Sequence, residues 1–212
     1  MSAAPSQRMD LLEILAAALL ALAAVGTAWS SYQASRWNGE QAKSFSRANA
    51  ARIESTRASA LADAQTQIDV ATFTQWVNAY AQEQTTLADF YFARFRPEFQ
   101  PAVEAWVATR PLRNPDAPLT PFAMPEYRVA ARAEAATLEA EAEEWSARAR
   151  EDVQRATNYV LGVVLFASAL FFAGMSAKLG TRRLQLILLS LGIAVFLLGV
   201  VWLATLPRSI SI

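Results

Sequence analysis

The residues of this sequence that could do chemistry are carboxylates, because its 212 residues include no histidine and no cysteine. Catalytic thiols, imidazole acid–base catalysis and zinc or haem sites built on Cys or His are therefore excluded. Carboxylates concentrate at Glu139, Glu141, Glu143 and Glu144. Glu139 and Glu143 share a helical face and could hold a cation, but carboxylate metal bundles rely on a Glu-x-x-His pattern. We interpret the cluster as a solvated helix face, and we expect no catalytic, cofactor-binding or metal-binding residue, no cofactor and no enzyme activity.

Glu13 is a second candidate, because an ionisable residue within a membrane span often marks a proton or ion path. It lies one turn from the predicted start of an apolar segment, where its side chain can reach the lipid headgroups. We favour a boundary residue and keep a functional carboxylate as the alternative.

The densest aromatic stretch, Phe90 to Phe99, also contains Arg94 and Arg96. Aromatic rings interleaved with arginine can stack on nucleic acid bases. The 19 basic residues are balanced by 19 acidic ones, however, so we expect no nucleic acid partner. The rings follow helical spacing, and we predict that they pack beneath the proline-rich segment that follows; a partner-binding surface is the alternative.

Three apolar segments must position these residues. Residues 11–31, 159–178 and 184–206 are predicted to be transmembrane helices, because each can cross a hydrocarbon core of about 30 Å. Charged residues make up only 18% of the chain, against about 25% in soluble domains. A cleaved signal peptide is the alternative for the first segment, but Asp10 and Glu13 make its start insufficiently basic. Tails at 1–10 and 207–212 and a short basic loop at 179–183 complete the membrane part.

Orientation follows from the short loop, whose positive charges favour the cytoplasm. Residues 32–158 hold 14 basic and 17 acidic residues, a net charge of −3, and are expected to be extracytoplasmic. Aromatic residues near the span ends are expected at the headgroups. The predicted interface and topology residues are Trp29, Tyr32, Trp37, Tyr159, Lys178, Arg182, Arg183 and Trp202.

Glycine and proline divide the region 32–158. Seven of the nine prolines fall within 97–125, whereas 126–158 contains neither Gly nor Pro. This pattern predicts helix, irregular segment, helix, with one uninterrupted helix from about Glu126 to Ala177. An unbroken helix over 40–95 would be about 84 Å long, against about 50 Å for 126–158. We therefore expect a fold-back near Asp63–Asp69, a bend at Trp37–Gly39 and a short helix over Pro97–Thr109.

The expected fold class is thus an all-α membrane protein. Three transmembrane helices accompany an antiparallel helical bundle or coiled-coil domain with a proline-rich tip at Pro111–Pro125. The tip either closes the end of the bundle, which we favour, or forms a recognition surface. Its possible interaction residues are Leu112, Leu119, Phe122 and Met124.

Three strings, Ala28–Gln41, Ala88–Phe99 and Asn114–Pro118, resemble a family of uncharacterised bacterial three-span membrane proteins. The family has a helical domain between its first two spans. The resemblance implies a multi-pass protein of the bacterial cytoplasmic (inner) membrane. It implies no activity and no site residues.

The function expected from these features is a non-enzymatic, membrane-anchored scaffold or protein-interaction module. The alternatives are an extracytoplasmic sensor that signals through a partner, and a subunit of a channel or transporter. Expected partners are the lipid bilayer and either a second copy or another membrane protein. Small residues on two spans (Ala17, Ala21, Ala24 and Ala28; Ala169, Ala173 and Ala177) predict close helix association.

Overall fold

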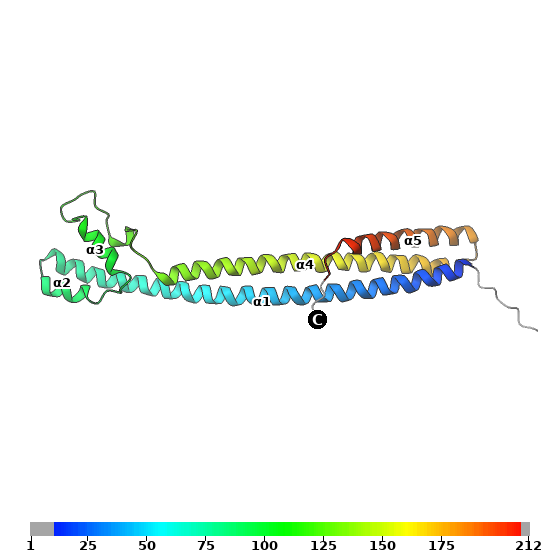
Figure 1. Ribbon diagram of the computed structural model, residues 1–212, viewed down its shortest axis with the longest axis horizontal. Helices are drawn as coiled ribbons and strands as arrows, with labels where there is room; N and C mark the ends of the chain where they lie inside the picture. The colour runs from blue at the N-terminus through cyan, green and yellow to red at the C-terminus, as the bar shows by residue number, and fades with distance from the viewer. Residues whose placement is uncertain (1–10, 209–212) are drawn as a thin grey trace, which may run out of the picture. The chain divides into compact units, whose positions relative to one another are not determined.

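The structure is a computed structural model that describes residues 11–208, so the predicted tail 1–10 and the last four residues of the tail 207–212 lie outside the described residues. Across the described range the chain is helical, without a β-strand. The elements, labelled in Figure 1, are α1 (Leu11–Ala81), α2 (Thr85–Phe92), α3 (Gln100–Ala108), a short 3-10 helix η1 (Pro121–Ala123), α4 (Ala130–Ser176) and α5 (Arg182–Thr205).

Helices α1, α4 and α5 are each long and apolar enough to cross a membrane, as a multi-pass membrane protein requires. The described chain divides into two compact units. Unit 1 consists of residues 11–46 and 145–208, and unit 2 consists of residues 47–144. Helices α1 and α4 contribute residues to both units.

In unit 1, α1, α4 and α5 lie side by side (Figure 1) and bury small side chains, together with a few leucines, between them. On α1 the buried positions Ala16, Ala23 and Ser30 recur every seven residues. Large apolar side chains on all three helices point outward instead. These are well exposed and include Leu22, Val25, Phe171, Ile187 and Val201. An apolar exterior around a core of small residues suits a lipid environment, in which helices associate by close backbone approach.

Phe166 of α4 occupies the space that two glycines leave open. A Cβ atom added to Gly26 of α1 would lie 2.9 Å from the Phe166 ring, and one added to Gly199 of α5 would lie 3.1 Å from it. Phe166 is fully buried, so its ring cannot move aside without displacing a neighbour. The ring therefore joins all three helices of unit 1.

In unit 2, α1 and α4 contact each other through a second set of small residues. Buried Ser55 donates a hydrogen bond of 2.9 Å to the carbonyl oxygen of Ala135. On either side of this contact lie Arg52, which pairs with Glu139 at 3.8 Å, and Asp63, which pairs with Arg132 at 3.1 Å. Residue numbers rise along α1 as the numbers of their partners fall along α4.

The prediction of one continuous returning helix is confirmed, because α4 runs without interruption from Ala130 to Ser176. The predicted fold-back near Asp63–Asp69 and the bend at Trp37–Gly39 are both wrong, because α1 continues through them to Ala81. Its sequence between Gly39 and Ala81 holds no Gly or Pro that would end the helix. The helix ends instead at Gln82–Gln84, where Glu83 adopts a φ of 59°.

In unit 2, short elements rather than a fold-back compensate for the difference in length between α1 and α4. The short helix expected within Pro97–Thr109 is present as α3, whose second residue is Pro101. Together with α2 and the segment after α3 it covers the last turns of α1, burying Phe73, Trp76 and Ala79. Short elements thus cover the end of α1, and α1 itself has no need to fold back.

We predict opposite effects of Gly→Ala at two positions of α1 in unit 1. Gly26→Ala places a methyl group against the buried Phe166 ring and should lower the free energy of unfolding by about 1–3 kcal/mol. Gly39→Ala should raise it by about 0.5–1 kcal/mol, since no described atom lies within 4 Å of the new Cβ and Ala is the better helix former. Thermal unfolding of the full chain in detergent, followed by circular dichroism, measures both. Equal effects at the two positions would contradict the packing described for Phe166.

Candidate functional site

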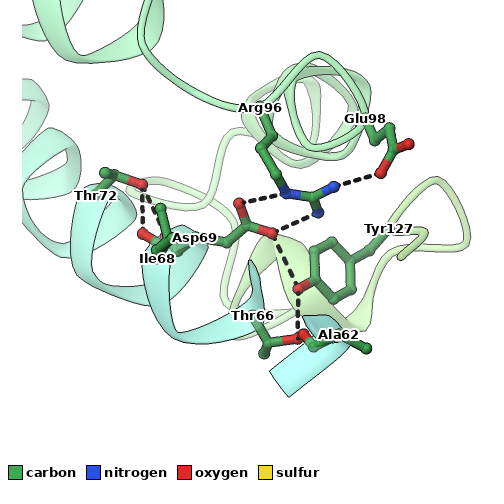
Figure 2. Close-up of polar contacts among 8 residues, drawn as sticks. All are labelled: Ala62, Thr66, Ile68, Asp69, Thr72, Arg96, Glu98 and Tyr127. Carbon is green, nitrogen blue, oxygen red and sulfur yellow. Dashed lines mark hydrogen bonds and ion pairs between the residues drawn. The ribbon is translucent and has the colours of Figure 1, made fainter. Parts of the chain in front are cut away.

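The most specific polar arrangement in unit 2 is a cluster that we call the Asp69 cluster: Asp69, Arg96, Glu98, Tyr127 and Thr66. Asp69 and Thr66 lie on α1, Arg96 and Glu98 lie in the turn between α2 and α3, and Tyr127 lies just before α4. Figure 2 shows the Asp69 carboxylate between the Arg96 guanidinium and the Tyr127 hydroxyl. Three segments that are distant in sequence therefore meet at one carboxylate.

The contact between Asp69 and Arg96 is bidentate. Arg96 donates from Nε to Asp69 Oδ1 at 3.2 Å and from Nη2 to Oδ2 at 2.8 Å. Its remaining nitrogen, Nη1, contacts Glu98. Tyr127 donates its hydroxyl hydrogen to Asp69 Oδ2 at 3.2 Å. Paired fork geometry of this kind gives the strongest charge-assisted hydrogen bonds.

Burial sets the electrostatics of the cluster. The Asp69 side chain is 1% exposed and the Arg96 side chain is 19% exposed, so little water screens the pair. The pKa of Arg96 is raised above its ordinary value, first by its hydrogen bonds to Asp69 and then by the charge of that carboxylate. The pKa of Tyr127 is also raised, mainly because burial disfavours the phenolate. Each group is thereby held in one protonation state, with Arg96 charged and Tyr127 neutral.

This arrangement holds three segments of the chain together. Both oxygens of Asp69 accept hydrogen bonds from Arg96 or Tyr127, and the side chain is 1% exposed. No group of three Asp or Glu side chains among residues 11–208 could hold a metal ion. The Asp69 cluster is therefore a buried structural joint.

An aromatic core lies beside this joint. Phe73 and Trp76 of α1 pack against the buried rings of Phe99 and Trp106. Phe99 directly precedes α3, and Trp106 lies within it. The ring of Phe122 stacks on Phe99 at 5.2 Å with an angle of 5°. The prediction that the aromatic stretch packs beneath the proline-rich segment is confirmed for Phe99, whose ring contacts Phe122. Phe95 is buried in the same core, whereas Phe90 is exposed.

The structure separates the four residues of the predicted interaction tip into two pairs. Phe122 and Met124 pack against the aromatic core. Leu112 and Leu119 are instead 64% and 94% exposed. The backbone that carries the second pair is nevertheless held, because Trp106 Nε1 donates to the carbonyl oxygen of Pro118 at 2.6 Å.

The predicted interface residues all lie in unit 1. Tyr159 is fully buried, and its hydroxyl donates to the carbonyl oxygen of Pro207 at 2.9 Å. Trp202 Nε1 donates to the carbonyl oxygen of Asn158 at 3.0 Å. The guanidinium of Arg155 lies over the Trp37 ring at 4.7 Å. The exposed members of the set are Trp29, Tyr32, Lys178, Arg182 and Arg183.

The carboxylates singled out in the sequence occupy ordinary positions. Glu139 and Glu143 both face Arg52 of α1, at 3.8 and 4.0 Å, which agrees with a solvated helix face. Glu13 is exposed in the first turn of α1. Sequence reasoning missed the Asp69 cluster, and the one available signal was an aspartate in the middle of an otherwise apolar stripe on α1.

No family model matches this chain, and no curated protein or solved structure is significantly similar to it. The resemblance to three-span bacterial membrane proteins therefore stays a prediction.

We predict that Arg96→Met lowers the free energy of unfolding by about 3–5 kcal/mol, because it leaves the buried Asp69 carboxylate without its counter-ion. Arg132→Met is the matched control: it removes an exposed pair with Asp63 and should change stability by no more than about 1 kcal/mol. Urea unfolding of the full chain in detergent, followed by tryptophan fluorescence, compares the two. The double variant Asp69→Leu with Arg96→Met should recover much of the loss. If Arg96→Met is no worse than Arg132→Met, the joint does not stabilise unit 2.

Proposed function

We propose that this protein is a non-enzymatic, multi-pass protein of the bacterial inner membrane that presents a protein-interaction module. In this proposal residues 32–158 form an antiparallel helical domain with a proline-rich tip at Pro111–Pro125. The observation that carries it is the exposure of Leu119 and Leu112 on a segment otherwise fixed against the aromatic core. The partner is a second copy of the chain or another membrane protein.

The held backbone of the tip supports binding over a passive connection. Asn114 accepts a hydrogen bond from the backbone nitrogen of Asp116 and donates to the carbonyl oxygen of Thr109. Five prolines further restrict the segment Pro111–Pro125. A segment already ordered before binding loses less conformational entropy in a complex. Exposed leucines on such a segment supply contact area at low entropic cost.

The antiparallel arrangement is supported by the order of contacts between α1 and α4 in unit 2, which run from Arg52 with Glu143 to Asp63 with Arg132. Small buried residues on both helices favour the close approach found in coiled coils. The proposed orientation has the Lys178–Arg183 loop in the cytoplasm and residues 32–158 outside, following the distribution of basic residues.

We predict that a membrane-impermeant maleimide labels Asp116→Cys but not Thr181→Cys in intact spheroplasts. The chain has no cysteine, so each variant carries a single thiol. Permeabilised cells, in which both variants should be labelled, serve as the control. Labelling of Thr181→Cys alone would reverse the proposed orientation.

We predict that Leu119→Asp abolishes co-purification of the partner from gently solubilised membranes and leaves the unfolding temperature unchanged, since the side chain is almost fully exposed. Phe122→Ala should lower the free energy of unfolding by roughly 3 kcal/mol, because it removes a ring from the aromatic core.

A cross-linker on Leu119→Cys identifies the partner, and a covalent dimer indicates a second copy. Glu134→Cys, exposed on α4, is the control position. If Leu119→Asp retains the partner, the tip is not the interaction surface.

A further inference from the structure

Unit 2 contains an open cleft of about 680 Å³ that the Asp69 cluster does not reach. Its first wall comes from the end of α1, the turn after it and α2. Its second wall comes from the end of α3 and the segment that follows. The volume falls within the range of about 300–1,000 Å³ typical of small-ligand sites.

The two walls carry opposite charges. Glu83 and Asp89 lie on the first wall, and Arg110 and Arg113 lie on the second. Within residues 11–208, none of these four side chains makes a hydrogen bond or an ion pair. The acidic and basic walls therefore face the same cleft without neutralising each other. Between them, Tyr80 and Leu112 supply apolar lining.

The cleft also contains both non-glycine residues of the described chain that have a positive φ. Glu83 has a φ of 59° and Arg110 has a φ of 56°. This left-handed conformation costs an L-residue roughly 1–2 kcal/mol, and here it follows the ends of α1 and α3, where it turns the chain into the cleft walls. The two strained residues stand on opposite walls, and each bears one of the unpaired charges.

We propose that this cleft binds a short peptide with free termini, whose carboxylate meets Arg110 and Arg113 and whose ammonium group meets Glu83 and Asp89. Guanidinium groups bind carboxylates through paired N–H donors, and carboxylates accept hydrogen bonds from an ammonium group. The Tyr80 ring and the Leu112 side chain contact the apolar part of the peptide. This site goes beyond the proposed interaction module and does not depend on a partner at Leu119.

The test is isothermal titration of the full chain in lipid nanodiscs with the tripeptide alanyl-leucyl-alanine. Its N-acetylated form and its C-terminal amide each remove one terminal charge. Either modification should weaken binding at least about tenfold, because each leaves a charged wall without a partner. The double variant Arg110→Gln with Arg113→Gln should bind the amide and the free acid equally. The double variant Glu83→Gln with Asp89→Gln should bind the acetylated and free peptides equally.

Arg128→Gln and Glu104→Gln are the control variants, since both residues are exposed in unit 2 and neither lines the cleft. They should bind the tripeptide as the unmodified chain does. The cleft substitutions are at exposed positions, and an unchanged unfolding temperature verifies that they fold. Three results would overturn the proposal: no heat of binding at millimolar tripeptide, equal affinity for the doubly blocked peptide, or tighter binding of free alanine than of the tripeptide.

Discussion

Close approach of helices through small buried side chains is the constraint on which the rest of this structure depends. Within unit 1 the buried face of α1 carries Ala16, Ala23 and Ser30, and within unit 2 it carries Ala51, Ala58 and Ala62. Where these small residues meet, the helix backbones approach closely and leave little room for large side chains. In unit 1 most leucine and valine side chains are therefore exposed on the outside of the helices. The Phe166 ring fits between the helices because Gly26 and Gly199 carry no side chain where it lies.

In unit 2 the pattern of small residues ends at Ala62, and large side chains replace them. Ala62 still packs with Ala131, at the start of α4, but the next buried positions of α1 are Asp69, Phe73 and Trp76. These have no α4 residues to pack against, because α4 begins only at Ala130. The aromatic rings of α3 and Phe122 fill that space. Asp69 lies at the transition, and its contacts with Arg96 and Tyr127 tie both connecting segments to α1.

Much of this fold could be predicted from the sequence, because length, apolarity and the absence of breakers act locally. The three apolar helices and the continuity of α4 follow from such signals. The prediction that α1 folds back was wrong because it rested on the assumption that a long helix needs an equally long partner. In the structure, two short helices cover the end of α1. The Asp69 cluster was missed for a different reason. Arg96 and Tyr127 are 27 and 58 residues away from Asp69, and no periodic pattern links residues at such separations.

Most of the residues used in the two proposals lie on the connecting segments of unit 2. Helix faces in unit 2 carry small residues in contact with another helix, charged pairs such as Arg52 with Glu139, and exposed apolar side chains such as Ile53 and Leu61. The connecting segments are anchored by their aromatic residues, and many of their other side chains are exposed and do not pack in the core. Leu119 and the unpaired charges of Glu83 and Arg110 all belong to such segments. A rigid core that anchors each connection at a few residues leaves many of the other residues exposed. We propose that these serve recognition, on the usual pattern of a rigid scaffold with its binding residues on loops.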